Sequence, residues 1–192
     1  MKKGFTIVEV SILFVIFLIV TFLVAPLSLD DTIQAKNTSK WRSVQADFVN
    51  IFYSINTSEN NEDFDFEKCF IEIINNEVKS AVEPYKITFR NGTYPSKSYV
   101  YQNYYKTYSD AVIAYKFYEE PINNIIGTLM YDVNGADSPN VWGKDVFGLN
   151  IYQDKFEPFG KLNSMIEQKQ DCSRNGTGLF CSNYYLIGGN FE

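Results

Sequence analysis

The sequence predicts an α+β protein in which one long N-terminal helix, half transmembrane and half amphipathic, packs on a small antiparallel β-sheet head. Three stretches predict this architecture. Residues 5–25 form an apolar run with a single charged side chain, and residues 26–56 place apolar side chains at helical spacing. Residues 57–192 combine β-branched and aromatic residues with turn residues, which is typical of short strands.

The apolar run over residues 5–25 has the length of a membrane-spanning helix. At 1.5 Å per residue it would extend about 31 Å, close to the thickness of the hydrocarbon core of a bilayer. Lys2 and Lys3 precede it, as the positive-inside rule expects for a cytoplasmic N-terminus. A cleaved signal peptide is disfavoured, because Leu23 is too large for position −3 and Pro26 would follow the cut. A plain single-pass anchor is the remaining alternative.

The string KGFTIVEV, residues 3–10, resembles the cleavage and methylation motif of type IV pilins and type II secretion pseudopilins. In that family a short basic leader ends in Gly, the mature chain begins with Phe, and the fifth mature residue is Glu. Gly4, Phe5 and Glu9 fill these places. The resemblance implies that a prepilin peptidase cuts after Gly4 and that Phe5 is then N-methylated.

The same resemblance gives a reason for a carboxylate in the apolar run. Such a carboxylate is costly in an apolar environment and is expected to have a partner. In the family, this Glu pairs with the α-amino group of an adjacent subunit, so Glu9 is expected to pair with the new N-terminus of a neighbouring Phe5. Pro26 matches the proline that bends the long helix in many pilins.

Beyond residue 25 the apolar spacing becomes that of one helical face. The apolar positions follow gaps of three, four and seven residues: Trp41, Val44, Phe48, Ile51, Phe52 and Ile55. A second helix is predicted from residue 66 until Pro84. Strands are predicted at residues 85–90, 111–119, 124–133 and 145–154, and a last strand after Cys181.

If these elements follow the pattern of the family that the motif resembles, the expected fold is the ladle-shaped fold of pilins. The resemblance implies four segments: a leader peptide (1–4), a transmembrane and filament-core helix (5–25), an amphipathic continuation of that helix (26–56) and a globular α+β head (57–192).

The composition argues against an enzyme and against a nucleic-acid partner. The chain has no histidine, which removes the commonest general base and the usual catalytic zinc ligand. Its formal charge is −6 and no run of Lys or Arg occurs, so no nucleic-acid binding is expected. A tyrosine-rich stretch could stack on DNA bases or sugars, but packing within the sheet is favoured. Its tyrosines are Tyr99, Tyr101, Tyr104, Tyr105 and Tyr108.

Cys172 and Cys181 lie nine positions apart, with Gly and Asn between them. Outside the cytoplasm this spacing predicts a disulfide that closes a short loop, whereas in the cytosol the two would stay reduced. The family often places such a loop at the edge of its sheet. Cys69 is left over and is expected to be a small core residue.

Oxygen donors gather in residues 131–148, a segment that resembles one common in pseudopilin-like proteins of type II secretion. They could surround a hard cation such as calcium, although the spacing is not that of an EF-hand. The favoured interpretation is a turn whose Asx side chains cap their own backbone, so that no cofactor is expected and calcium is the alternative. The candidate metal ligands are Asp132, Asn134, Asp137, Asn140 and Asp145.

The sequence thus predicts a structural subunit of a type IV pilus-like filament or a type II secretion pseudopilus. Its expected partners are other pilin-like subunits, the prepilin peptidase, an inner-membrane assembly platform and membrane lipid. The expected location is the bacterial inner membrane, single-pass with the head outside the cytoplasm, and then a periplasmic or extracellular filament. Two alternatives stay open: a minor pilin that binds DNA, a surface or a secreted substrate, and a membrane-anchored domain of other function.

Overall fold

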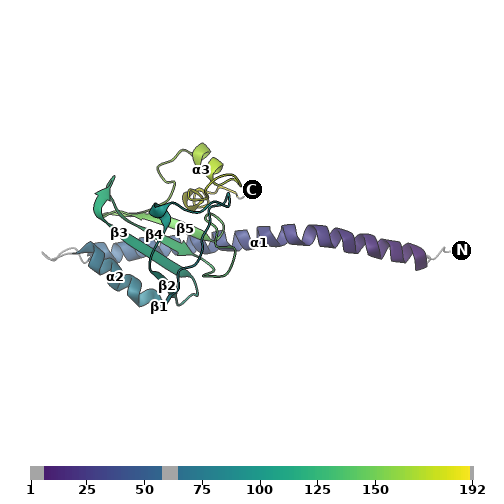
Figure 1. The fold of residues 1–192 in the computed structure, drawn as a ribbon, viewed down its shortest axis with the longest axis horizontal. Helices are drawn as coiled ribbons and strands as arrows, with labels where there is room; N and C mark the ends of the chain where they lie inside the picture. Colours follow the sequence, from purple (N-terminus) through teal and green to yellow (C-terminus); the bar gives the residue numbers. More distant parts are fainter. Residues whose placement is uncertain (1–6, 58–64, 191–192) are drawn as a thin grey trace. The chain divides into compact units, whose positions relative to one another are not determined.

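The computed structural model describes residues 7–57 and 65–190, and the chain divides into two units, Met1–Lys36 and Asn37–Glu192. Helix α1 (Ile7–Thr57) contributes residues to both units. All other described elements belong to the second unit (Figure 1): α2 (Phe66–Glu77), β1 (Val78–Val82), the 3₁₀ turn η1 (Lys97–Tyr99), β2 (Tyr104–Thr107), β3 (Val112–Ile122), β4 (Ile125–Asp132), β5 (Val146–Ile151), β6 (Phe156–Pro158), α3 (Met165–Asp171) and α4 (Cys181–Tyr184).

Helix α1 corrects the predicted transmembrane span. It has 51 residues, but within the described part of the chain no helix is both long enough and apolar enough to cross a membrane. The predicted fold class is therefore wrong in its transmembrane half, although helices beside an antiparallel sheet agree with an α+β chain. The predicted single-pass location in the inner membrane is wrong for the same reason.

The sheet is a six-stranded antiparallel meander in the order β1-β2-β3-β4-β5-β6. The strands predicted at residues 111–119, 124–133 and 145–154 are confirmed as β3, β4 and β5. Because successive side chains of a strand point to opposite faces, the register sorts the core residues into two sets. Tyr131 pairs with Ile113 on one side and Phe147 on the other, so these three side chains share a face.

Both faces of the sheet are covered by apolar side chains. On one face, buried residues of α1 and α2 pack with the set that contains Tyr131, and Trp41, Phe70 and Phe147 are fully buried there. On the other face, Trp142 and Met130 are fully buried in a second cluster, formed mainly with loop residues. The head thus has a core on each side of one sheet.

Three predicted elements differ from the structure. The strand predicted at residues 85–90 does not form, and Thr88 makes an isolated bridge to Val141. The helix expected to run until Pro84 ends at Glu77, and Val78–Val82 forms β1, because this short β-branched segment pairs with β2. The residues after Cys181 form α4 rather than a last strand. Four consecutive side chains, Cys181–Tyr184, are buried, and a strand would turn every second one outward.

Candidate functional site

The residues predicted for processing and assembly lie in the first 26 positions of the chain. Gly4 and Phe5 lie outside the described residues. Glu9 is exposed in the first turn of α1, where a negative side chain suits the helix dipole. Pro26 lies within α1, which continues through it without interruption.

Every described side chain from Ile7 to Phe22 is exposed. The large apolar ones recur on all sides of the helix, with Ile7 86 %, Phe17 65 % and Phe22 85 % exposed. We call residues 7–22 the apolar segment. A helix that is apolar on every face is normally buried, so this segment is a candidate surface for association.

Further along α1, the residues of the second unit are fixed to the head by specific contacts. Trp41 is fully buried, stacks on Phe147 with ring centroids 5.0 Å apart, and donates from Nε1 to the Ser182 carbonyl at 2.8 Å. Arg42 donates from Nε and Nη2 to the Tyr185 carbonyl at 3.0 and 2.7 Å. This part of α1 therefore forms a structural element of the head.

The predicted disulfide between Cys172 and Cys181 is confirmed, with Cα atoms 5.1 Å apart. Asp171 closes the enclosed loop: its carboxylate accepts hydrogen bonds from the backbone N–H groups of Thr177 and Phe180, both at 2.8 Å. A Cβ added at Gly143, whose φ is +76°, would lie 2.5 Å from Cys181 Sγ, so this backbone contacts the disulfide directly. Cys69, in contrast, is a free, partly buried thiol of α2.

Two of the five predicted metal ligands, Asp132 and Asp145, are fully buried. Asp132 accepts a hydrogen bond from the Tyr85 hydroxyl at 2.7 Å. Asp145 accepts hydrogen bonds from the backbone N–H groups of Asn140 at 2.8 Å and Val141 at 2.7 Å. Burial and the charge of Asp145 raise the pKa of Asp132 to about 8, and burial also raises the pKa of Asp145.

The other three predicted ligands occupy different positions. Asn134 and Asn140 donate from their amide nitrogens to loop carbonyls, as expected for an Asx-capped turn. Their side-chain oxygens are buried yet accept no hydrogen bond within the described residues. Asp137 is exposed, and its backbone carbonyl, rather than its carboxylate, accepts from Asn134.

This donor set fits a hard cation in part. Two buried carboxylates and two orphaned amide oxygens, in Asp132, Asp145, Asn134 and Asn140, are the oxygen ligands that calcium prefers. Across residues 7–57 and 65–190, however, no group of three or more Asp, Glu, His or Cys side chains converges on one point. A cation in this loop would thus depend on amide and carbonyl oxygens as well as on the acid pair.

The tyrosine-rich stretch does not form a stacking surface. Tyr101 and Tyr104 are buried, and Tyr99 and Tyr105 are partly buried, so Tyr108, at 69 % exposed, is alone among the five in being open to solvent. Tyr99 packs against Trp142 and Phe159 in the second core cluster. Packing within the head, the favoured interpretation, agrees with this arrangement.

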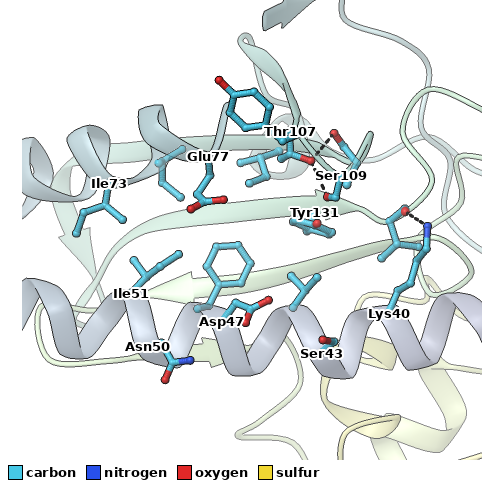
Figure 2. A pocket seen from close by; sticks show the side chains of 17 residues that line it. Lys40, Ser43, Asp47, Asn50, Ile51, Ile73, Glu77, Thr107, Ser109 and Tyr131 are labelled. Atoms are coloured by element: carbon cyan, nitrogen blue, oxygen red, sulfur yellow. Dashed lines mark hydrogen bonds between the residues drawn. The ribbon is translucent and has the colours of Figure 1, made fainter. Parts of the chain in front are cut away.

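A groove of about 790 Å³ lies in the head between α1, α2 and the sheet. Figure 2 shows Asp47 and Ile51 of α1 on one wall, Ile73 and Glu77 of α2 on another, and Tyr131 of β4 between them. Sequence reasoning missed this groove, because its walls come from segments far apart in the chain and no local pattern marks it.

No family model, curated protein or solved structure matches this chain. The resemblance of residues 3–10 to the prepilin motif therefore stays a prediction.

Proposed function

We propose that this protein is a structural subunit of a type IV pilus-like or type II secretion pseudopilus filament. Its chain is cut by a prepilin peptidase after Gly4, N-methylated at Phe5, and assembled with other copies or other pilin-like subunits through the apolar segment. The observation that carries the proposal is the exposure of apolar side chains on every face of residues 7–22.

Exposure of these apolar side chains to water is energetically unfavourable. Each large apolar side chain left in water forgoes about 1.5–3 kcal/mol relative to burial, and more than ten of them occur between Ile7 and Phe22. Copies of the same helix are suitable partners, because every copy exposes the same apolar side chains. Side-by-side packing of these helices would bury the segment in the centre of a filament.

Glu9 has a defined role in this proposal. It is the one acidic side chain of the apolar segment, and it lies in the first turn of α1, as the fifth residue after the cut. Cleavage creates an ammonium group at Phe5 that can neutralise the Glu9 carboxylate of an adjacent copy. Pairing of this kind is what allows a carboxylate to enter an apolar core.

The direct test is the mass and N-terminal sequence of the chain co-expressed with and without a prepilin peptidase. The proposal predicts a mature chain that starts at Phe5 and carries one added methyl group only when the peptidase is present. A Gly4→Leu variant, whose large side chain blocks the cut, should keep Met1. A wild-type chain that still starts at Met1, or is cut after residue 25, would remove the proposal.

We also propose that the head holds a hard cation, with calcium the best fit, at the loop of Asp132 and Asp145. The two orphaned amide oxygens, in Asn134 and Asn140, favour this over a plain Asx-capped turn. The ion would neutralise two buried carboxylates that otherwise repel each other. It would stiffen the loop that packs on the disulfide.

Thermal unfolding in calcium chloride and in EGTA tests the cation proposal. A ligand that binds only the folded head stabilises it by about 2.7 kcal/mol at a free concentration 100 times its dissociation constant. The Asp145→Asn variant should lose this increment, and Asp154→Asn, an exposed carboxylate outside the loop, should keep it. Equal midpoints of the wild type in calcium and EGTA would leave the Asx-capped turn as the explanation.

A further inference from the structure

The groove of the head has the size and lining of a small-molecule site. Its volume of about 790 Å³ lies within the roughly 300–1,000 Å³ of typical ligand pockets. Apolar side chains of three elements line it, among them Phe48 of α1, Ile73 of α2 and Ile113 of β3. An apolar ligand body would therefore lose its contact with water on several sides at once.

The charged groups of the groove are mainly acidic. Asp47 of α1 and Glu77 of α2 both line it, and both are exposed (Figure 2). Neither forms an ion pair with a described Lys or Arg. Lys40 is the one basic side chain in the lining, and its Nζ already donates to the Val133 carbonyl at 3.0 Å.

The position of Asp47 gives the groove a polar end. Burial and, to a lesser extent, the charge of Asp47 raise the pKa of Tyr131, whereas hydrogen bonds with Ser109 and Thr107 lower it. Thr107 and Ser109 complete this end, with their hydroxyl oxygens 2.9 Å apart. The groove thus offers a ligand an apolar lining and a negatively charged end.

We propose that this groove binds a small organic cation with an apolar body, of the alkylammonium type. The apolar lining of the groove contacts the hydrocarbon chain, and the carboxylates of Asp47 and Glu77 bind the ammonium group. A peptide fits less well, because the strands that line the groove, β2, β3 and β4, are paired on both edges and leave no edge for an added strand.

Three probes of equal chain length separate the hydrocarbon from the charge: octylammonium, octanol and octanoate. We would follow the side-chain methyl NMR signals of Ile73, Ile113 and Val133 in the full-length protein at neutral pH. Octylammonium should bind about tenfold more tightly than octanoate, the scale of two exposed ion pairs, with octanol between them. Saturable shifts of these methyl groups distinguish the groove from the apolar segment, which also attracts hydrocarbon.

Charge reversal provides the sharper test. The double variant Asp47→Lys with Glu77→Lys should invert the preference, so that octanoate binds more tightly than octylammonium. The control Glu72→Gln removes an exposed carboxylate of α2 that does not line the groove, and should leave all three affinities unchanged. Ser43→Trp, an exposed lining position, should block all three probes without altering the buried core.

The outcomes are distinct. Selective binding of octylammonium that inverts on charge reversal supports the proposal. Equal binding of the three probes overturns the assignment of a cationic ligand, and the absence of saturable shifts at the three methyl groups overturns the site. Residues 7–22 are unchanged in every variant, so differences in binding between the variants report on the groove and not on filament assembly.

Discussion

The two parts of α1 differ in how their apolar side chains are covered. In residues 7–22 every described side chain is exposed, whatever its polarity. In residues 37–57, Trp41 and Phe48 are buried in the head, and polar neighbours such as Arg42 bond to backbone carbonyls of the C-terminal segment. One continuous helix thus combines an exposed apolar segment and a part that is anchored to the head.

This difference shows that helix formation and helix burial are separate matters. The anchored part gains its stability from contacts that one copy of the chain supplies. The large apolar side chains of the apolar segment are exposed, so their burial depends on another molecule. Substitutions in the two parts should therefore affect different properties, and this expectation can be tested.

The largest effect on the head is expected for Trp41→Ala. This change removes a fully buried indole, its stacking on Phe147 and its hydrogen bond to Ser182. We expect a loss of about 3–5 kcal/mol in the free energy of unfolding, which denaturant titration would measure. A loss below about 1 kcal/mol would show that the anchored part of α1 does not stabilise the head.

Loss of the disulfide should rank second. A covalent loop of this length stabilises a fold by about 2–3 kcal/mol, so the Cys172→Ser, Cys181→Ser double variant should unfold at correspondingly lower denaturant. Dithiothreitol should lower the stability of the wild type but not that of the double variant. Cys69→Ser is the control, because Cys69 takes no part in the bond and its loss should leave the response to dithiothreitol intact.

The stability of the cation-free head should fall as the pH rises. Asp132 has a folded pKa of about 8, and an unfolded Asp has one of about 4. Its protonated form therefore supports the fold fully below pH of about 4, and this support is lost progressively as the pH rises to about 8. The charge of Asp145 strengthens this effect, whereas the hydrogen bond from the Tyr85 hydroxyl lowers the pKa of Asp132 and weakens it.

Unfolding midpoints in EGTA across this pH range would measure that decline. The Asp132→Asn variant, which keeps the shape without the ionisation, should show a flatter profile. If the unfolding midpoint of the wild type instead rose steadily between pH of about 5 and about 8, this would contradict the loss of stability that the raised pKa of Asp132 predicts.

The smallest effect on the head is expected for Phe17→Ala. Phe17 is 65 % exposed, so its removal should change the free energy of unfolding of the head by less than about 0.5 kcal/mol. Association of copies should nevertheless weaken, as sedimentation velocity would show. If Phe17→Ala instead destabilised the head as strongly as Trp41→Ala, the contrast between the two parts of α1 would be lost.

The sequence was most informative where local pattern and burial agree. The content of β-branched and aromatic residues located β3, β4 and β5, and the helical spacing placed Trp41 and Phe48 on the buried face of α1. The spacing of Cys172 and Cys181 predicted their disulfide, because a short Gly- and Asn-containing segment can return on itself.

Prediction failed where tertiary contacts override local preference. Val78–Val82 reads as a continuation of α2, but pairing with β2 makes it a strand. The buried environment of Asp145 and the groove beside Asp47 depend on segments distant in the chain, so no local pattern reveals them. The transmembrane prediction for residues 5–25 is wrong, because no helix among the described residues is long and apolar enough to cross a membrane.

The most direct test of the central claim is photo-crosslinking from position 17, where a photoreactive phenylalanine analogue replaces Phe17 in the cell. We expect a crosslinked product made of two pilin-like chains, which is lost when Gly4→Leu prevents processing. The same analogue at Tyr108, an exposed site of the head, serves as the control for chance contact. Crosslinks from position 17 that never join two such chains would contradict assembly through the apolar segment.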